Sequence, residues 1–314
     1  MPASALNLFL ALRMRLVRSL GEFLTFAPRV PATVSLDIEG LELPDEYSGF
    51  AGQRQTRPNP PLFDPEASQM LTERLPLEML KVAATSSALP GNLHRQVVLA
   101  AWVRAVMLED GATAGGLVPI VKEVEPALKA LLDGYLAEKD PDGRKFAAVF
   151  TILKFPGLRP FIAAGAARET SFEKIDNYRD NWWCSFAPAG KNPPEYNYYT
   201  MGLTSNGWQG SSVPDKSVPE PAFPDAAAQA KAKEEWQRLV ALPAAPDYLT
   251  QQVIAYATKF PQDPRVPEAL HLAVRTTRFG CTDAGTTKFS RQAFELLHKN
   301  YPVSEWTKKT PHWY

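Results

Sequence analysis

The sequence lacks an excess of charge of either sign. Its 34 basic and 34 acidic residues cancel, so no overall field attracts a nucleic acid. The sequence also lacks an uninterrupted run of 18 apolar residues, which a membrane-spanning helix requires. We therefore expect neither a nucleic-acid partner nor a transmembrane segment. The hydrophobic content of 45% predicts a sizeable buried core for a chain of 314 residues.

Motifs that define a reaction are also lacking. The histidines show no HExxH pattern and no pair four residues apart, although His271 and His298 could meet across adjacent helices. The stretch GATAGG at 111–116 lacks the lysine of a phosphate-binding loop. His94 is expected on the polar edge of a helix, and His312 adds no ligand pattern. We expect no metal, no cofactor and no catalytic residue.

Only two cysteines are present, Cys184 and Cys281, and neither belongs to a CxxC motif. The interpretation ranked first is two reduced, buried thiols. The second is a disulfide that closes a loop over the intervening residues and indicates an exported protein. The third, a nucleophile, has no spaced His-Asn or His-Asp signature to support it.

Proline, by contrast, is abundant. The 29 prolines are about twice the usual share of roughly 5%, and they cluster between segments. They divide the chain into five segments. These are an N-terminal amphipathic helix (1–27), a Pro-rich strap or linker (28–64), a helical domain (65–175), an aromatic and Pro-rich loop (176–224) and a helical repeat domain (225–314).

The N-terminal segment has apolar residues at helical spacing. Its arginines follow the apolar stretch, whereas those of a signal peptide precede it. We expect a single amphipathic helix over 1–27 with its stripe docked on the domain. Contact of residues 1–24 with a membrane surface or a partner is the alternative. The stripe comprises Leu6, Leu10, Met14, Val17 and Leu24.

Residues 65–175 show the apolar period of helices. The stretch around Leu93, Val97 and Ala101 is apolar on most of its circumference and predicts a central, buried helix. Further stripes lie near Leu132 and Phe150, and prolines fall near the expected helix ends. The spacing predicts antiparallel helix hairpins.

Residues 176–224 break this pattern, and their aromatic density argues against disorder. Glu173, Asp176 and Asp180 are spaced to share one helical face beside Trp182 and Trp183. Paired carboxylates next to tryptophans are typical of glycoside hydrolysis. The competing interpretation is a solvated face, on which an arginine pairs with a carboxylate and fixes the loop.

The aromatic residues of this loop are the best candidate surface. Packing between helices is the first interpretation, a surface for a protein or peptide the second, and a carbohydrate platform the third. The candidate partner-binding residues are Tyr178, Arg179, Trp182, Trp183, Tyr196, Tyr198, Tyr199 and Trp208.

The C-terminal segment contains an internal echo. Lys259-Phe260-Pro261 and Asn300-Tyr301-Pro302 each place an aromatic residue and a proline after a helical stretch, at a period of 41 residues. With the polar turn 262–264 and the alanines Ala269 and Ala273, this pattern resembles the tetratricopeptide-like repeats of bacterial envelope proteins. The likeness covers about 70 residues. It implies a helical scaffold that binds proteins or peptides, and no chemistry.

The chain departs from that family in two places. The connection 279–288 is long, and the second copy stops at Tyr314 without its partner helix, so we expect the last residues to fold back as a cap. The half-finished repeat leaves open whether the chain is part of a longer protein. The whole chain also resembles uncharacterised helical proteins of bacteria, a likeness that implies no activity.

We therefore predict an all-α protein of antiparallel helix hairpins, with a tetratricopeptide-like α-solenoid and a long ordered aromatic loop. The expected function is a non-enzymatic scaffold for a protein or peptide partner. The alternatives are a glycan-binding or glycan-cleaving protein that uses the 173–183 cluster, and a subunit of a larger assembly docked through its N-terminal helix. Export to the periplasm is favoured over a cytoplasmic location.

Overall fold

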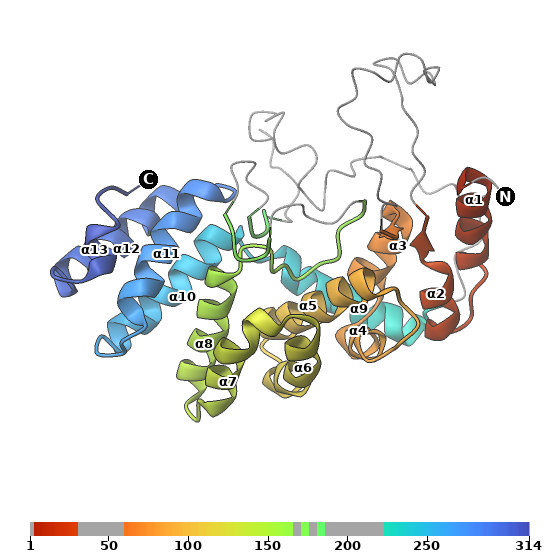
Figure 1. The fold of residues 1–314 in the computed structure, drawn as a ribbon, viewed down its shortest axis with the longest axis horizontal. Coiled ribbons are helices and arrows are strands. Elements are labelled where there is room, and N and C mark those ends of the chain that lie inside the picture. Colours follow the sequence, from red (N-terminus) through yellow and green to blue (C-terminus); the bar gives the residue numbers. More distant parts are fainter. Residues whose placement is uncertain (1–2, 31–59, 166–170, 176–180, 186–222, 314) are drawn as a thin grey trace, which may run out of the picture.

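The computed structural model describes residues 3–30, 60–165, 171–175, 181–185 and 223–313 (Figure 1). Within them the chain is all-α, as predicted, apart from two strands of two residues each. The helices before the aromatic loop are α1 (Ala3–Met14), α2 (Leu20–Phe26), α3 (Pro65–Gln69), the π-helix η2 (Met70–Arg74), α4 (Leu77–Ala84), α5 (Gly91–Met107), α6 (Gly111–Val124), the 3-10 helix η3 (Pro126–Leu128), α7 (Lys129–Ala137) and α8 (Pro141–Lys154). Those after it are α9 (Ala226–Val240), α10 (Ala245–Lys259), α11 (Val266–Phe279), α12 (Thr286–Asn300) and α13 (Glu305–Lys308).

The N-terminal segment forms two helices, so the expectation of one continuous helix is wrong. Ser19 has an extended backbone, and its hydroxyl accepts a hydrogen bond from the backbone N–H of Glu22, which starts α2. The Glu22 carboxylate in turn accepts from the backbone N–H of Arg18. This reciprocal arrangement is close to a capping box, and it favours a new helix start over continuation of α1.

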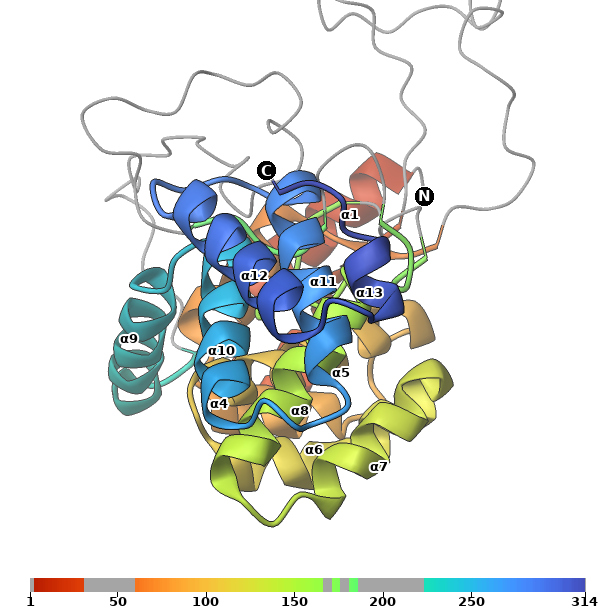
Figure 2. The same cartoon turned by 90° about the vertical axis from the view of Figure 1, so that its left-hand side faces the viewer.

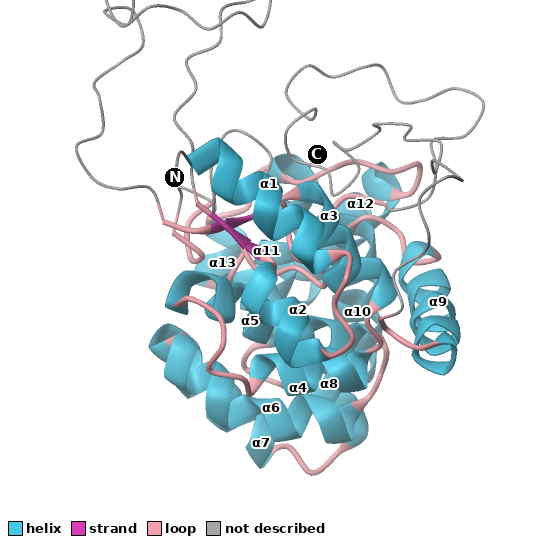
Figure 3. Cartoon of the chain, turned by 90° about the vertical axis from the view of Figure 1, so that its right-hand side faces the viewer, coloured by secondary structure: helices cyan, strands magenta, loops and turns pink. Residues whose placement is uncertain are grey.

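The ends of the strap lie together. Strand β1 (Pro28–Arg29) pairs antiparallel with β2 (Leu62–Phe63), with Pro28 opposite Phe63 (Figure 3). The buried Arg29 donates to the Asp64 carboxylate at 2.6 Å. The middle of the predicted strap, residues 31–59, lies outside the described residues.

Helix α5 is central, as predicted. Leu93, Val97 and Ala101 are fully buried, and α4 and α6 pack on either side of it. Its Arg104 is also buried, and the guanidinium donates to the backbone carbonyls of Thr72, Leu75 and Pro160. Burial lowers the pKa of Arg104 to about 10, so this side chain remains charged at neutral pH. The charge therefore serves to hold the end of η2 and the segment after α8 on the core.

Helix α9 packs on the N-terminal helices, although the sequence placed it in the C-terminal domain. Glu235 accepts from the backbone N–H of Leu77 at 2.7 Å, and Arg238 donates to the carbonyl of Leu108 at the same distance. The buried Ala232 and Leu239 lie on one side of α9. In Figure 2 the helix runs along the outer side of the body. One continuous hydrophobic core joins the two predicted domains.

The remaining helices form a row. Helices α7 and α8 pack as a pair, α10 packs on α8, α11 and α12, and α13 closes the row against α11. Figure 1 shows this row ending at α12 and α13, opposite the end of the molecule that carries α1. Helices α10, α11 and α12 all lie within 225–314, the segment for which the sequence predicts helices.

The aromatic-proline echo corresponds to a repeated backbone turn. Phe260 and Tyr301, which end α10 and α12, have φ,ψ angles of −128°, 62° and −133°, 51°. The backbone N–H of Asp263 donates to the carbonyl of Phe260, and the backbone N–H of Ser304 donates to the carbonyl of Tyr301 in the same way. The Tyr301 hydroxyl also donates to the Pro261 carbonyl at 2.6 Å, which joins the two turns directly.

None of the described helices combines the length and the apolar character that crossing a membrane requires.

Candidate functional site

Most of the predicted loop surface cannot be placed. The described parts of the loop are the segment 181–185 and the last two residues, Phe223 and Pro224, and the segment 171–175 before the loop is also described. Glu173 is exposed there and lies in a turn, not in a helix. The other predicted positions lie outside the described residues: Asp176, Tyr178, Arg179, Asp180, Tyr196, Tyr198, Tyr199 and Trp208.

Trp182 and Trp183 lie in the core. Their exposed fractions are 2% and 1%. The indole N–H of Trp182 donates to the backbone carbonyl of Ile152 at 2.9 Å. The backbone N–H of Trp182 donates to the backbone carbonyl of Pro156 at 2.6 Å. The carbonyl of Trp183 accepts from the backbone N–H of Ala245, at the start of α10. The packing interpretation is thus confirmed for these two residues, because neither indole lines an open groove.

The backbone at Trp182 is unusual, with φ at 59°. A bulky residue in this left-handed region is strained by contact between its Cβ and the backbone. The segment 181–185 accepts that strain because several contacts hold it between α8 and α10. The buried Asn181 is among them, since its amide donates to the carbonyl of Phe279 at the end of α11.

Cys184 and Cys281 form a disulfide, with the Cα atoms 5.2 Å apart. The first-ranked interpretation, two reduced thiols, is therefore wrong, and the disulfide of the second interpretation is confirmed. The bond ties the aromatic segment to the connection after α11 across 97 positions of sequence. The tryptophan segment is thus a structural link between α8 and the last helices, held by both packing and a covalent bond.

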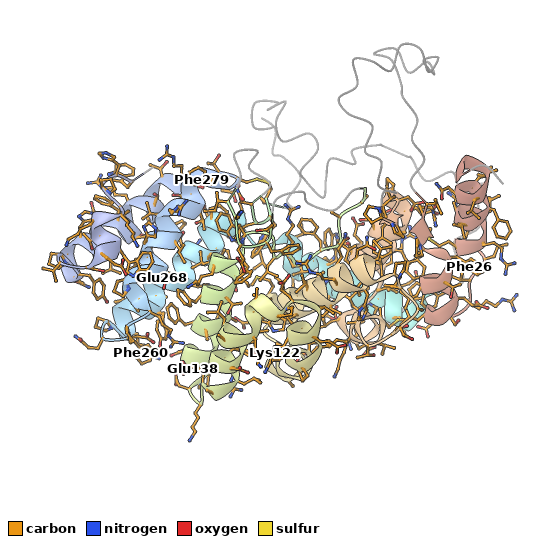
Figure 4. The ribbon with its side chains drawn as sticks, in the orientation of Figure 1. Phe26, Lys122, Glu138, Phe260, Glu268 and Phe279 are labelled. Atoms are coloured by element: carbon orange, nitrogen blue, oxygen red, sulfur yellow. A yellow bond between two sulfur atoms is a disulfide. The ribbon has the colours of Figure 1, made fainter. Side chains whose placement is uncertain are left out.

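A groove between α8 and α10 is the concave feature with the most specific lining. Phe146 of α8 stacks on Tyr256 of α10, with ring centroids 3.9 Å apart and planes at 5°. Phe260 lies 4.8 Å from Tyr256 and continues this aromatic row. Ala255 and Gln252 complete the lining on the α10 side, around a cavity of about 210 Å³. Figure 4 labels Phe260 at the end of α10 and Glu138 just before α8.

Lysines flank the groove, each with an acidic partner. Lys145 binds Glu109 at 2.7 Å, and Lys259 binds Asp142. The four side chains are all exposed. Exposed pairs of this kind contribute little to stability, because water competes for both charges. A carboxylate from a ligand can therefore replace either acid at little cost.

A half-buried charge network fixes the floor of the groove. Arg265 binds Asp263 at 2.6 Å and Glu138 at 2.7 Å, and its guanidinium carbon lies 5.1 Å from the Phe146 ring centroid. The Tyr256 hydroxyl donates to Asp263 at 2.9 Å. Burial, followed by this hydrogen bond, raises the pKa of Tyr256 to about 12, so the phenol stays protonated. The hydrogen bond to Asp263 thereby holds the Tyr256 ring, and the rings stacked on it, in one geometry.

The histidines hold the C-terminal cap. His271 Nδ1 lies 2.7 Å from the Thr310 hydroxyl, and His298 Nε2 lies 2.8 Å from the Thr310 carbonyl. The two side chains thus meet through Thr310, as the sequence allowed, and the last residues fold back as expected. His94 contacts the carbonyl of Ala84, and His312 is exposed. Within the described ranges, no three His, Cys, Asp or Glu side chains form a cluster that could hold a metal ion.

A second hollow, of about 370 Å³, lies between η2 and α9 and is lined by Glu73, Arg74, Gln229 and Lys233 with two alanines. It has no aromatic floor and no fixed network, so it offers less to a specific ligand.

The sequence analysis missed the groove. Phe146 belongs to the apolar stripe near Phe150, and Tyr256 lies 110 positions later, so no local pattern joins them. One sequence pattern could have related the two helices that form the groove: the tripeptide Lys154-Phe155-Pro156 after α8 is identical to Lys259-Phe260-Pro261 after α10. Phe155 has φ,ψ angles of −124°, 79°, and its carbonyl likewise accepts from the residue three positions on.

Comparison of the chain with models of protein families, with curated proteins and with solved structures found no match.

Proposed function

We propose that the protein is a non-enzymatic helical scaffold that binds a peptide segment of a protein partner in the groove between α8 and α10. The observation that carries the proposal is the pair of half-buried rings of Tyr256 and Phe260, backed by the buried Phe146, in a concave site flanked by lysines. A rigid aromatic surface binds an apolar side chain with little loss of conformational entropy.

The row of helix pairs supports a repeat architecture for this scaffold. Pairs α10/α11 and α12/α13 are related by the period of 41 residues, their aromatic-proline turns match, and Tyr301 joins them through Pro261. We assign them as tetratricopeptide-like units, with α7/α8 as the preceding layer. Stacked pairs of this kind create extended binding surfaces from helix faces.

The size and charge of the groove favour a peptide over a small cofactor. Its volume of about 210 Å³ is below the roughly 300–1,000 Å³ of typical small-molecule pockets. One apolar side chain fits such a space, and a neighbouring carboxylate can bind Lys145 or Lys259. The proposed ligand is therefore a segment with an apolar side chain next to an acidic one.

Blocking the groove tests the proposal. Ala255→Trp places an indole in the groove from an exposed position, and Thr258→Trp places one on an exposed position of the same helix that does not line the groove. Peptides selected from a random display library on the wild-type protein would be titrated by fluorescence anisotropy against the wild type and both variants. Circular dichroism melts would confirm that each variant is folded.

We expect Ala255→Trp to weaken selected peptides at least about tenfold, and Thr258→Trp to leave the Kd unchanged. The selected sequences should combine apolar and acidic residues. If the library yields no binder, or if Ala255→Trp binds every peptide as the wild type does, the groove is not the binding site.

We further infer that the protein matures in an oxidising compartment, because structural disulfides persist there and are rare in a reducing cytosol. The test is alkylation of denatured protein from its native source, followed by intact mass. Thiols that react only after reduction support export, whereas thiols that react at once contradict it.

A further inference from the structure

Helix α1 and the turn after it expose a continuous apolar face. Leu8, Phe9, Leu12 and Leu16 are 62%, 50%, 55% and 70% exposed. Leu8 and Leu12, four positions apart, lie on one side of the helix with Phe9 beside Leu8, and Leu16 follows in the turn after it. Of the nine large hydrophobic residues exposed in the described part of the chain, these four lie within nine positions. Figure 1 shows α1 at one extremity of the molecule.

The opposite side of α1 is already fixed to the protein. Met14 and Val17 are buried, and the Asn7 amide exchanges two hydrogen bonds with the backbone of Val30, at 2.7 and 2.9 Å. Arg15 binds Glu66 at 2.9 Å. The helix is therefore apolar on two sides, of which the protein covers one. An all-round apolar helix is stable when both sides are covered.

Helix α1 and the turn after it carry positive charge only, although the carboxylates of Glu66 and Glu22 lie beside Arg15 and Arg18. Residues 3–21 contain Arg13, Arg15 and Arg18 and no acidic residue. All three arginines are exposed, and the guanidinium of Arg13 lies 5.1 Å from the ring centroid of Phe26. Aliphatic side chains next to arginines match the interface of an anionic bilayer, where apolar groups enter the acyl boundary and guanidinium groups contact phosphates.

We propose that α1 docks the protein on an anionic membrane surface, with Leu8, Phe9, Leu12 and Leu16 in the interfacial layer and Arg13 and Arg18 at the headgroups. The helix lies parallel to the surface and does not span it. A bilayer suits this face better than a protein partner, because the arginines provide the charge complement and the leucines present no pocket or hydrogen-bonding group for a partner to read. The rest of the molecule, including the groove between α8 and α10, then projects away from the membrane.

The test is flotation of the full-length protein with vesicles of phosphatidylcholine alone or with about one third phosphatidylglycerol. Leu12→Glu removes an apolar contact and adds a repelled charge. Leu136→Glu is the matched control, because Leu136 is a leucine of α7 with an exposed fraction of 47%. Arg18→Gln tests the headgroup contact. Thermal melts and sedimentation velocity of every variant report folding and self-association.

We expect binding to the anionic vesicles that falls with added salt, a loss of at least about tenfold for Leu12→Glu, and a loss of about fivefold for Arg18→Gln. Leu136→Glu should bind as the wild type does. Failure of the wild type to float with anionic vesicles overturns the proposal, as does equal binding to both kinds of vesicle. A dimer that Leu12→Glu dissociates, without vesicle binding, would assign the face to a second copy of the chain instead.

Discussion

Replacement of His271 by glutamine should make the stability of the protein less sensitive to acid. The His271 side chain is buried between α11 and the C-terminal cap, where it contacts Thr310 and lies 5.2 Å from the Trp306 ring centroid. Burial, with smaller contributions from the nearby charges of Arg275 and Lys309, lowers the pKa of His271 to about 4. The folded protein therefore resists protonation of this ring.

The sign and size of the effect follow from linkage. An unfolded chain protonates His271 near the ordinary histidine pKa of 6.5, so the unfolded state binds more protons wherever the pH lies between that value and about 4. The contribution of neutral His271 to stability is fully present above about pH 7 and is lost as the pH falls through this window. A shift of about 2.5 units corresponds to about 3 kcal/mol in total, of which about 2 kcal/mol is lost by pH 5.

The assay is urea unfolding of the wild type and His271→Gln at several pH values from about 7.5 to about 4.5. Carboxylates titrate equally in both proteins, so the difference between their unfolding free energies isolates the histidine. The wild type should lose about 2 kcal/mol more than the variant between about pH 7.5 and pH 5. Parallel pH profiles would refute the buried, neutral state of His271.

Three further outcomes are expected. Replacing Cys184 and Cys281 together by serine should lower the unfolding free energy by about 2–5 kcal/mol in denaturant titrations, because the disulfide closes a loop of nearly 100 residues. An unchanged denaturation midpoint would show that packing alone holds the tryptophan segment. Arg104→Met should cost about 3 kcal/mol, since three carbonyls lose their donor, and a variant as stable as the wild type would contradict that role. Tyr301→Phe should cost about 1 kcal/mol by removing the bond to Pro261, and a melting temperature identical to that of the wild type would show that the bond contributes nothing.

The C-terminal helices were predictable because their signals are local. Asp225, a residue type that favours helix starts, accepts from the backbone N–H of Ala228 and starts α9. Prolines after Phe260 and Tyr301 stop α10 and α12. The amphipathic period indicated the helical residues between these starts and stops. These signals depend on neighbours within a few positions and need no knowledge of the fold.

The break between α1 and α2 is also encoded locally, but the sequence analysis missed it. Ser19 and Glu22 carry the spacing of a capping box, yet the apolar stripe from Leu6 to Leu24 continues at helical period across it. The stripe favours one helix and the cap favours two. Both interpretations are locally consistent, and the structure shows that the cap determines the outcome.

The groove and the buried charge could not be predicted from the sequence. Phe146 meets Tyr256 only because α8 and α10 pack together, and Arg104 resembles the polar edge of an apolar helix. The disulfide could not be predicted with certainty for the same reason, because the bond between Cys184 and Cys281 forms only where the fold places the segment 181–185 next to Cys281. Contacts across such distances arise from tertiary packing, which periodicity does not specify.

The most direct test of peptide binding is site-specific photocrosslinking in the native source. A photoreactive phenylalanine analogue would replace Ala255 in one version and Thr258 in another, since both positions are exposed on α10 and only Ala255 lines the groove. We predict a discrete crosslinked protein from position 255 that is absent from position 258 and weakened by Lys259→Glu. Identical crosslinks from both positions, or none from position 255, would contradict the proposal that this groove holds a partner.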